Sequence, residues 1–125
     1  MSVKELKIFT GTLMEYCKNT IGYKKYKGLP SVSIRKHPSS DNQLGEYDPN
    51  VHKITLFYNN IKTMNGLVTV FVHEYTHSVQ NLRYYAARYK KFGYSNHPDE
   101  IEARNNEKKF GKSAFKHLKK HIKNG

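Results

Sequence analysis

The most constraining feature of the sequence is a segment between residues 67 and 82 that is rich in apolar residues and contains two histidines and a glutamate. Its apolar side chains recur at helical spacing and on several sides of the helix, which is typical of a nearly buried helix. His73, Glu74 and His77 interrupt this apolar surface. Because burying an unpaired polar group costs free energy, the segment predicts a buried helix with a polar site on it.

The spacing of these residues indicates a metal site. Two histidines four residues apart lie about 40° apart around a helix and one turn along it, so both imidazoles reach one ion. Glu74 directly follows His73, which places its carboxylate beside the metal, where it takes a proton from a zinc-bound water. A catalytic zinc needs three protein ligands, so a third must come from elsewhere in the chain.

Helical phase separates the downstream candidates for the third ligand, which are His97, Asp99, Glu100, Glu102, Glu107, His117 and His121. We expect a last helix from Pro98 to about Lys120 or Ile122, with Asn96 or His97 as its N-cap. At 100° per residue, Glu100 lies at the centre of the apolar face, which includes Ala103, Glu107, Phe110, Ala114, Phe115, Leu118 and Ile122. A carboxylate on that face is costly without a cationic partner, and zinc would be that partner.

Two alternatives stay open for the third ligand. His97 is one, since SprT-like proteases, which are drawn to DNA, use a later histidine. Glu102 is the other, although it lies about 200° from Glu100 around the helix and is expected to face solvent. His117 and His121 repeat the four-residue spacing, but they lie among lysines and are expected on a solvated basic face.

These residues resemble the gluzincin metallopeptidases: His73-Glu74-x-x-His77, followed by a helix with Pro98-x-Glu100-x-x-Ala103. The chain looks most similar to minimal single-domain forms, including short phage-encoded proteins and the peptidase domain of the ImmA/IrrE group. The resemblance covers roughly residues 50 to 110. Arg104 departs from it, because that group often has Asn or Asp at this position.

The resemblance implies a zinc-dependent metallopeptidase in which His73, His77 and Glu100 are the ligands and Glu74 is the general base. It also implies that the strand at 51–58 is the edge strand along which an extended polypeptide substrate docks. We therefore expect residues 1–125 to form a single α+β domain of minimal zincin-like architecture. Its elements would be a helix at 3–18, strands at 31–35 and 51–58, the helix with the histidines, and a C-terminal helix that supplies Glu100.

The net charge of the chain leads to a second expectation, which concerns its binding partners. Twenty-two Lys and Arg against ten Asp and Glu give a formal net charge of +12. Such a balance attracts nucleic acid or another polyanion, or merely keeps the protein soluble. The alternative function is accordingly a non-enzymatic basic protein of a virion or a nucleic-acid complex, with a structural or vestigial metal site.

Cysteine use and the N-terminus bear on localisation. Cys17 is the single cysteine, so an intramolecular disulfide and a zinc site built from Cys pairs are both excluded. No apolar segment resembles a signal peptide or reaches the ~18 residues of a membrane span. We expect a cytoplasmic location, or the host cytoplasm or virion if the chain is phage-encoded.

A group of tyrosines follows the histidine helix: Tyr84, Tyr85, Tyr89 and Tyr94. They have the chemistry to stack on bases or to orient a substrate, but packing in the core or at its rim is the expected role for each. One of them would be suited to stabilise an oxyanion, and the sequence does not indicate which.

Overall fold

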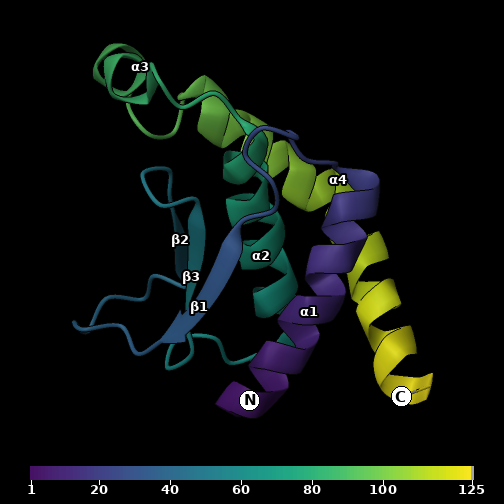
Figure 1. Ribbon diagram of the computed structural model, residues 1–125. Helices are drawn as coiled ribbons and strands as arrows, with labels where there is room; N and C mark the ends of the chain where they lie inside the picture. The colour runs from purple at the N-terminus through teal and green to yellow at the C-terminus, as the bar shows by residue number, and fades with distance from the viewer. Residues whose placement is uncertain (125) are drawn as a thin grey trace.

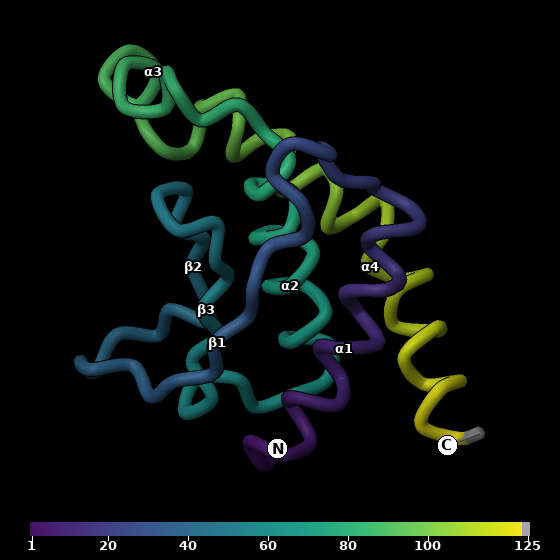
Figure 2. Tube along the Cα trace, viewed as in Figure 1, coloured from purple at the N-terminus to yellow at the C-terminus, as the bar shows by residue number. Residues whose placement is uncertain are grey.

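The computed structural model describes residues 1–124, which form an α+β structure. The helices are α1 (Val3–Thr20), α2 (Met64–Val79), α3 (Tyr85–Phe92) and α4 (Pro98–Asn124), and the strands are β1 (Ser31–Arg35), β2 (Gly45–Asp48) and β3 (Lys53–Phe57). The sheet lies on one side of α2, with α4 on the other, and α3 projects at one end (Figure 1). The first turn of α1 and the last described turn of α4 lie at the opposite end of the molecule (Figure 2).

Helix α1 confirms the helix predicted at 3–18 and extends it by two residues. Ser2 and Glu5 form a capping box, in which each side chain accepts a hydrogen bond from the other residue's backbone N–H. Leu6 and Leu13 are fully buried on the predicted inward face. This face fixes α1 against the rest of the core.

The three strands form a mixed sheet in the order β1-β3-β2. β1 runs parallel to β3 with Val32 opposite Ile54, and β2 runs antiparallel to β3 with Tyr47 opposite Ile54. The predicted strands at 31–35 and 51–58 are thus present as β1 and β3. The expectation that the strand at 51–58 is an edge strand is wrong, because β2, which the sequence did not predict, pairs with its other side.

Helix α2 is the centre of the structure and confirms the predicted buried helix. Leu67, Phe71 and Tyr75 are fully buried, and the Tyr75 hydroxyl donates a hydrogen bond of 2.7 Å to the carbonyl of Gly22. At the N-terminus of α2 the Thr63 side chain accepts from the Gly66 N–H. The apolar sides of α2 therefore contact the sheet and the other helices, and its polar residues share the remaining side.

Helix α4 begins at Pro98 as predicted and packs against α2 and α1 (Figure 1). Ala103, Ala114 and Leu118 are fully buried on its inner face, where the two alanines allow α2 and α4 to approach closely. Ile122, which was expected on the same face, is 44% exposed, because the buried part of that face ends at Leu118. Within residues 1–124, no helix has the length and apolar character needed to cross a membrane.

Candidate metal centre

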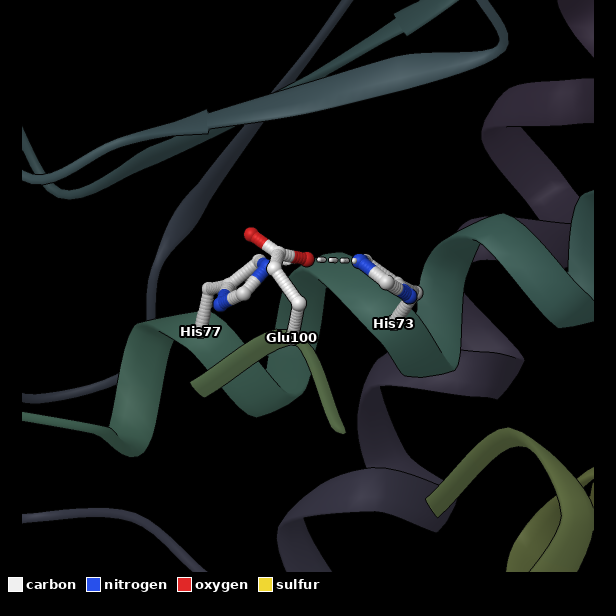
Figure 3. Close-up of side chains that lie close together, drawn as sticks. All are labelled: His73, His77 and Glu100. Atoms are coloured by element: carbon white, nitrogen blue, oxygen red, sulfur yellow. Dashed lines mark hydrogen bonds and ion pairs between the residues drawn. The ribbon is translucent and has the colours of Figure 1, made fainter. Parts of the chain in front are cut away.

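Helix α2 brings His73 and His77 to one side, one helical turn apart (Figure 3). Their ring centroids lie 4.9 Å apart, with the ring planes at 77° to each other. Both Nε2 atoms face away from the core toward the first turn of α4. The two imidazoles are therefore directed at one region, as their four-residue spacing predicted.

Glu100 reaches the same region from α4. The helix starts at this point because His97 caps it: the Asp99 N–H donates to His97 Nδ1 at 3.1 Å, and Pro98 occupies the first helical position. Glu100 is only 3% exposed. Its Oε1 accepts from His73 Nε2 at 2.9 Å and from His77 Nε2 at 3.0 Å, while its Oε2 accepts from the Tyr85 hydroxyl.

These three residues fit a divalent metal ion by the type and position of their donor atoms. Two imidazole nitrogens and one carboxylate oxygen are a donor set that zinc accepts, and these atoms lie within 4.8 Å of one another. Metal–ligand bonds of ~2.0–2.1 Å in a tetrahedron place ligand atoms about 3.3 Å apart. The nitrogen–oxygen distances of 2.9 and 3.0 Å are shorter than this by only a few tenths of an ångström.

The other ring nitrogen of each histidine, Nδ1, also has a polar partner. His77 Nδ1 lies 2.7 Å from Gln80 Oε1, and His73 Nδ1 lies 3.4 Å from Glu107 Oε1. The Gln80 amide group donates to the Asp99 carbonyl at 2.9 Å and to Glu102 Oε1 at 2.8 Å, which orients its oxygen toward His77. Because that oxygen only accepts, His77 Nδ1 carries a proton, and Nε2 is the nitrogen left to bind a metal.

Without a metal, the cluster is stabilised as imidazolium and carboxylate. Burial by itself lowers the pKa of His73, but hydrogen bonds to Glu100 and Glu107 and the charge of Glu74 outweigh it and raise the pKa to about 10. The pKa of His77 is raised in the same way, against the effect of burial, by Glu100 and Gln80. Burial opposes ionisation of Glu100, yet its bonds to both histidines and Tyr85 lower its pKa. A metal ion must therefore displace protons to bind here.

Glu74 lies beside this cluster and outside it. Its carboxylate makes no hydrogen bond or ion pair among residues 1–124, although the residue is only 9% exposed. Burial raises the pKa of Glu74, while the neighbouring His73 and His77 lower it by a smaller amount. The carboxylate is thus positioned to exchange a proton with a molecule in the adjoining cleft.

An open cleft of about 460 Å³ exposes the cluster to solvent. One wall comes from β2 and the segments beside it, and the opposite wall comes from the chain after α2. Its lining residues are Gln43, Gly45, Glu46, Tyr47, Pro49, His73, Glu74, His77, Leu82, Tyr85, Tyr94 and Glu100. The cleft therefore brings the cluster, Glu74 and the unpaired edge of β2 into one space.

The structure gives the alternative ligands other positions. His97 is fully buried, and its ring stacks on Tyr85 with centroids 4.0 Å apart. One of its nitrogens accepts from the backbone of α4, and the other contacts the Tyr85 carbonyl at 2.9 Å. Glu102 is exposed, as expected. Its carboxylate accepts a hydrogen bond from Gln80, and Gln80 in turn contacts the ring of His77.

The remaining expectations for this region need correction. Tyr84, Tyr89 and Tyr94 are 52%, 51% and 51% exposed, so none of them packs in the core, and α3 buries none of its residues. His117 is half-buried, and its ring lies 5.5 Å from that of Tyr16, whereas a solvated position was expected. The exposed His121 does lie on the solvent side.

Sequence reasoning did not predict that Gln80, Tyr85 and Glu107 contact the three residues of the cluster. Gln80 lies three residues after His77, and Glu107 lies seven after Glu100, but neither spacing indicates a contact with a histidine ring by itself. A signal for Glu107 was its place on the inner face of α4 with Glu100. No protein-family model, curated protein or solved structure matches the chain.

Proposed function

We propose that the protein is a zinc-dependent metallopeptidase. The observation that carries the proposal is the convergence of His73 Nε2, His77 Nε2 and Glu100 Oε1, with Glu74 unpaired beside them in an open cleft. The resemblance of these residues to the gluzincin pattern and the α+β arrangement around α2 support the same assignment. A zincin-like fold is part of this proposal.

The proposed reaction is hydrolysis of a peptide bond. A bound zinc supplies a Lewis acid that polarises a carbonyl group and makes water acidic enough to lose a proton near neutral pH. With zinc held by His73, His77 and Glu100, Glu74 would accept a proton from the attacking water and would then donate it to the departing amine. Gln80 and Glu107 hold the two histidine rings in the orientation that keeps Nε2 directed at the metal.

The unpaired edge of β2 is the proposed binding site for an extended polypeptide. The Phe57 N–H donates to the Leu44 carbonyl, so alternate residues of β2 bond to β3. The backbone groups of Gly45 and Tyr47 consequently point away from β3, and both residues line the cleft. The Gly45 carbonyl accepts a hydrogen bond of 3.1 Å from the Gln43 side-chain amide, which a substrate strand would displace on pairing there. A substrate strand paired with this edge would pass over the histidines, as in other complexes in which a peptide extends a sheet.

Tyr94 is the proposed donor to the oxygen that develops negative charge. It lines the cleft, whereas the Tyr85 hydroxyl is already bonded to Glu100. Burial, followed by the charges of Glu100 and Glu74, raises the pKa of Tyr94, so its hydroxyl keeps its proton at neutral pH and remains a donor.

The decisive comparison is between wild type and Glu74→Gln, both loaded with zinc and incubated with unfolded casein. Wild type should cleave the casein, and the variant should bind zinc equally well while losing activity by a factor of about 10² or more. Glu15→Gln, at an exposed position on α1, is the matched control and should keep full activity. Zinc binding without cleavage by any of the three proteins would instead favour a non-enzymatic protein with a structural metal.

A further inference from the structure

The second half of α4 carries a continuous basic surface on the side opposite the metal cluster. After Glu107 the chain has no further acidic side chain. Seven exposed lysines occupy this part of the helix, and we call them the lysine stripe: Lys108, Lys109, Lys112, Lys116, Lys119, Lys120 and Lys123. At 100° per residue they cover an arc of about 120°, centred roughly opposite the buried face of α4.

The charges of the lysine stripe are not neutralised within the described part of the chain. Among residues 1–124, the single ion pair formed by a Lys or Arg side chain joins Arg88 to Asp99. The ammonium groups of Lys109 and Lys119 lie over the rings of Phe110 and Phe115, at 5.1 and 5.4 Å. The remaining five lysines have no aromatic or acidic neighbour of this kind.

The stripe has a regular spacing along the helix. Lys108, Lys112, Lys116 and Lys120 recur every four residues, which places them about 6 Å apart along the helix axis and about 18 Å from first to last. Each step of four residues also turns by about 40°, so these four lysines cross the 120° arc obliquely. An array of positive charges of this length is complementary to a polymer that carries closely spaced phosphates. Duplex nucleic acid presents one negative charge per ~1.7 Å of its axis.

We propose that the lysine stripe binds the phosphate backbone of duplex nucleic acid without reading its sequence. A membrane surface fits less well, because a helix that binds lipid inserts an apolar face, and the apolar face of α4 is buried through Ala103, Ala114 and Leu118. A single strand also fits less well, because the aromatic rings beside the stripe, those of Phe110 and Phe115, are partly buried and lie under the ammonium groups of Lys109 and Lys119, so bases cannot stack on them freely.

This binding site is separate from the metal centre although both use α4. Glu100 lies in the first turn of the helix on its buried face, while the stripe lies at the far end on the exposed face. The proposal therefore does not rest on the proposed peptidase activity. A protein bound to duplex through the stripe would keep its cleft open to a substrate.

The test compares two variants that lose the same number of charges. The stripe variant carries Lys108→Gln, Lys112→Gln, Lys116→Gln and Lys120→Gln. The control variant carries Lys4→Gln, Lys25→Gln, Lys36→Gln and Lys62→Gln, all at exposed positions outside α4. Binding of the complete protein to a fluorescent 20-base-pair duplex is measured by anisotropy between 50 and 200 mM salt, and circular dichroism confirms that both variants are folded.

Four phosphate contacts predict a slope of about −3.6 for log affinity against log salt, or a loss of roughly 100-fold over this range, in wild type and control. The stripe variant should bind at least tenfold more weakly at 50 mM salt and show a much shallower slope. If the two variants lost the same amount of affinity for the duplex, net charge alone would explain the binding, and the proposal would be overturned. Absence of duplex binding, or tighter binding of wild type to vesicles with 30% phosphatidylserine than to the duplex, would overturn it as well.

Discussion

At the scale of single residues, Glu100 is the position on which the proposed metal centre depends. It is a buried carboxylate that accepts hydrogen bonds from two histidines and a tyrosine. Such a group is expensive to bury without cations, and here the two protonated histidines supply the positive charge that a metal ion would supply in place of their protons. Two residues further along the helix, Glu102 lies in solvent and interacts only with Gln80.

The first prediction ranks the zinc affinities of three variants. Glu100→Ala removes a ligand and should lower zinc affinity by well over 100-fold, whereas Gln80→Ala, which frees the ring of His77, should lower it by about 10 to 100-fold. Glu102→Ala should cost less than tenfold, because Gln80 keeps its bond to the Asp99 carbonyl. Competition with a chromogenic chelator measures all three. A larger loss for Glu102→Ala than for Glu100→Ala would contradict the ligand assignment.

The second prediction concerns pH. His73 has its pKa raised to about 10, so between pH 6 and 8 it holds a proton that zinc must displace. Zinc affinity should consequently rise by about tenfold or more per pH unit over this whole range. A histidine with an ordinary pKa of about 6.5 would give an affinity that levels off above pH 7. Calorimetry in two buffers with different ionisation enthalpies counts the protons released, and a count near zero at pH 7.5 would disprove this picture.

At the scale of elements, β2 determines how the cleft is built. Its four residues, Gly45–Asp48, pair with β3 and pass close to α2. A Cβ atom on Gly45 would lie 2.9 Å from the Thr55 carbonyl oxygen and 3.0 Å from Val70 Cγ2. The absence of a side chain at this one position therefore allows the strand to reach α2 and to form the wall of the site.

The third prediction follows from that close approach. Gly45→Ala should destabilise the protein by about 1–3 kcal/mol, because the backbone of β3 has no room to yield, and should reduce peptidase activity by displacing β2. Gly11→Ala is the matched control: it lies within α1 with nothing within 4 Å of its added Cβ, and it should stabilise by roughly 0.5–1 kcal/mol. Urea unfolding measures both, and equal behaviour of the two variants would show that the contact at Gly45 is unimportant.

The elements that sequence reasoning predicted are those with a local periodic signal. The helices α1, α2 and α4 have apolar faces at helical spacing, and β1 and β3 show alternation or a β-branched run. β2 lacks such a signal, because Gly45, Glu46 and Asp48 are poor strand formers, and only its pairing with β3 makes it a strand. The strand order depends on the same pairing between distant residues, so the edge of the sheet was assigned incorrectly.

The candidate site, like the fold, could be predicted from the sequence only in part. His73, Glu74 and His77 share one helix and could be predicted from their spacing alone. Helical phase favoured Glu100 as the third residue but left His97 and Glu102 open, and the resemblance to the gluzincins pointed to Glu100. The contacts of Gln80, Tyr85 and Glu107 depend on how α2, α3 and α4 pack together. The position of α3 was the least predictable from sequence, because this helix buries none of its residues. It is linked to α4 by the ion pair between Arg88 and Asp99 and by the hydrogen bond from Tyr85 to Glu100.

At the scale of the whole molecule, charge is unevenly distributed. Half of the ten acidic residues lie in one region of α2 and α4, namely Glu74, Asp99, Glu100, Glu102 and Glu107, while the formal net charge is +12. Of these five, Glu74 and Glu100 line the cleft, where Glu46 joins them, so three carboxylates lie around the cleft in a protein of net positive charge. This arrangement suits a centre that attracts a metal cation and a surface that attracts a polyanion, and α4 contributes to both.

The fourth prediction tests the central claim, that His73, His77 and Glu100 form a zinc centre, and a single crystallographic measurement decides it. Crystals of the zinc-loaded protein should show, in data collected on either side of the zinc absorption edge, one anomalous peak per chain. It should lie within bonding distance, ~2.0–2.2 Å, of His73 Nε2, His77 Nε2 and Glu100 Oε1, with Glu74 beside it and not bound. No peak at this position, or a peak bound by His97 or Glu102 in place of Glu100, would contradict the account.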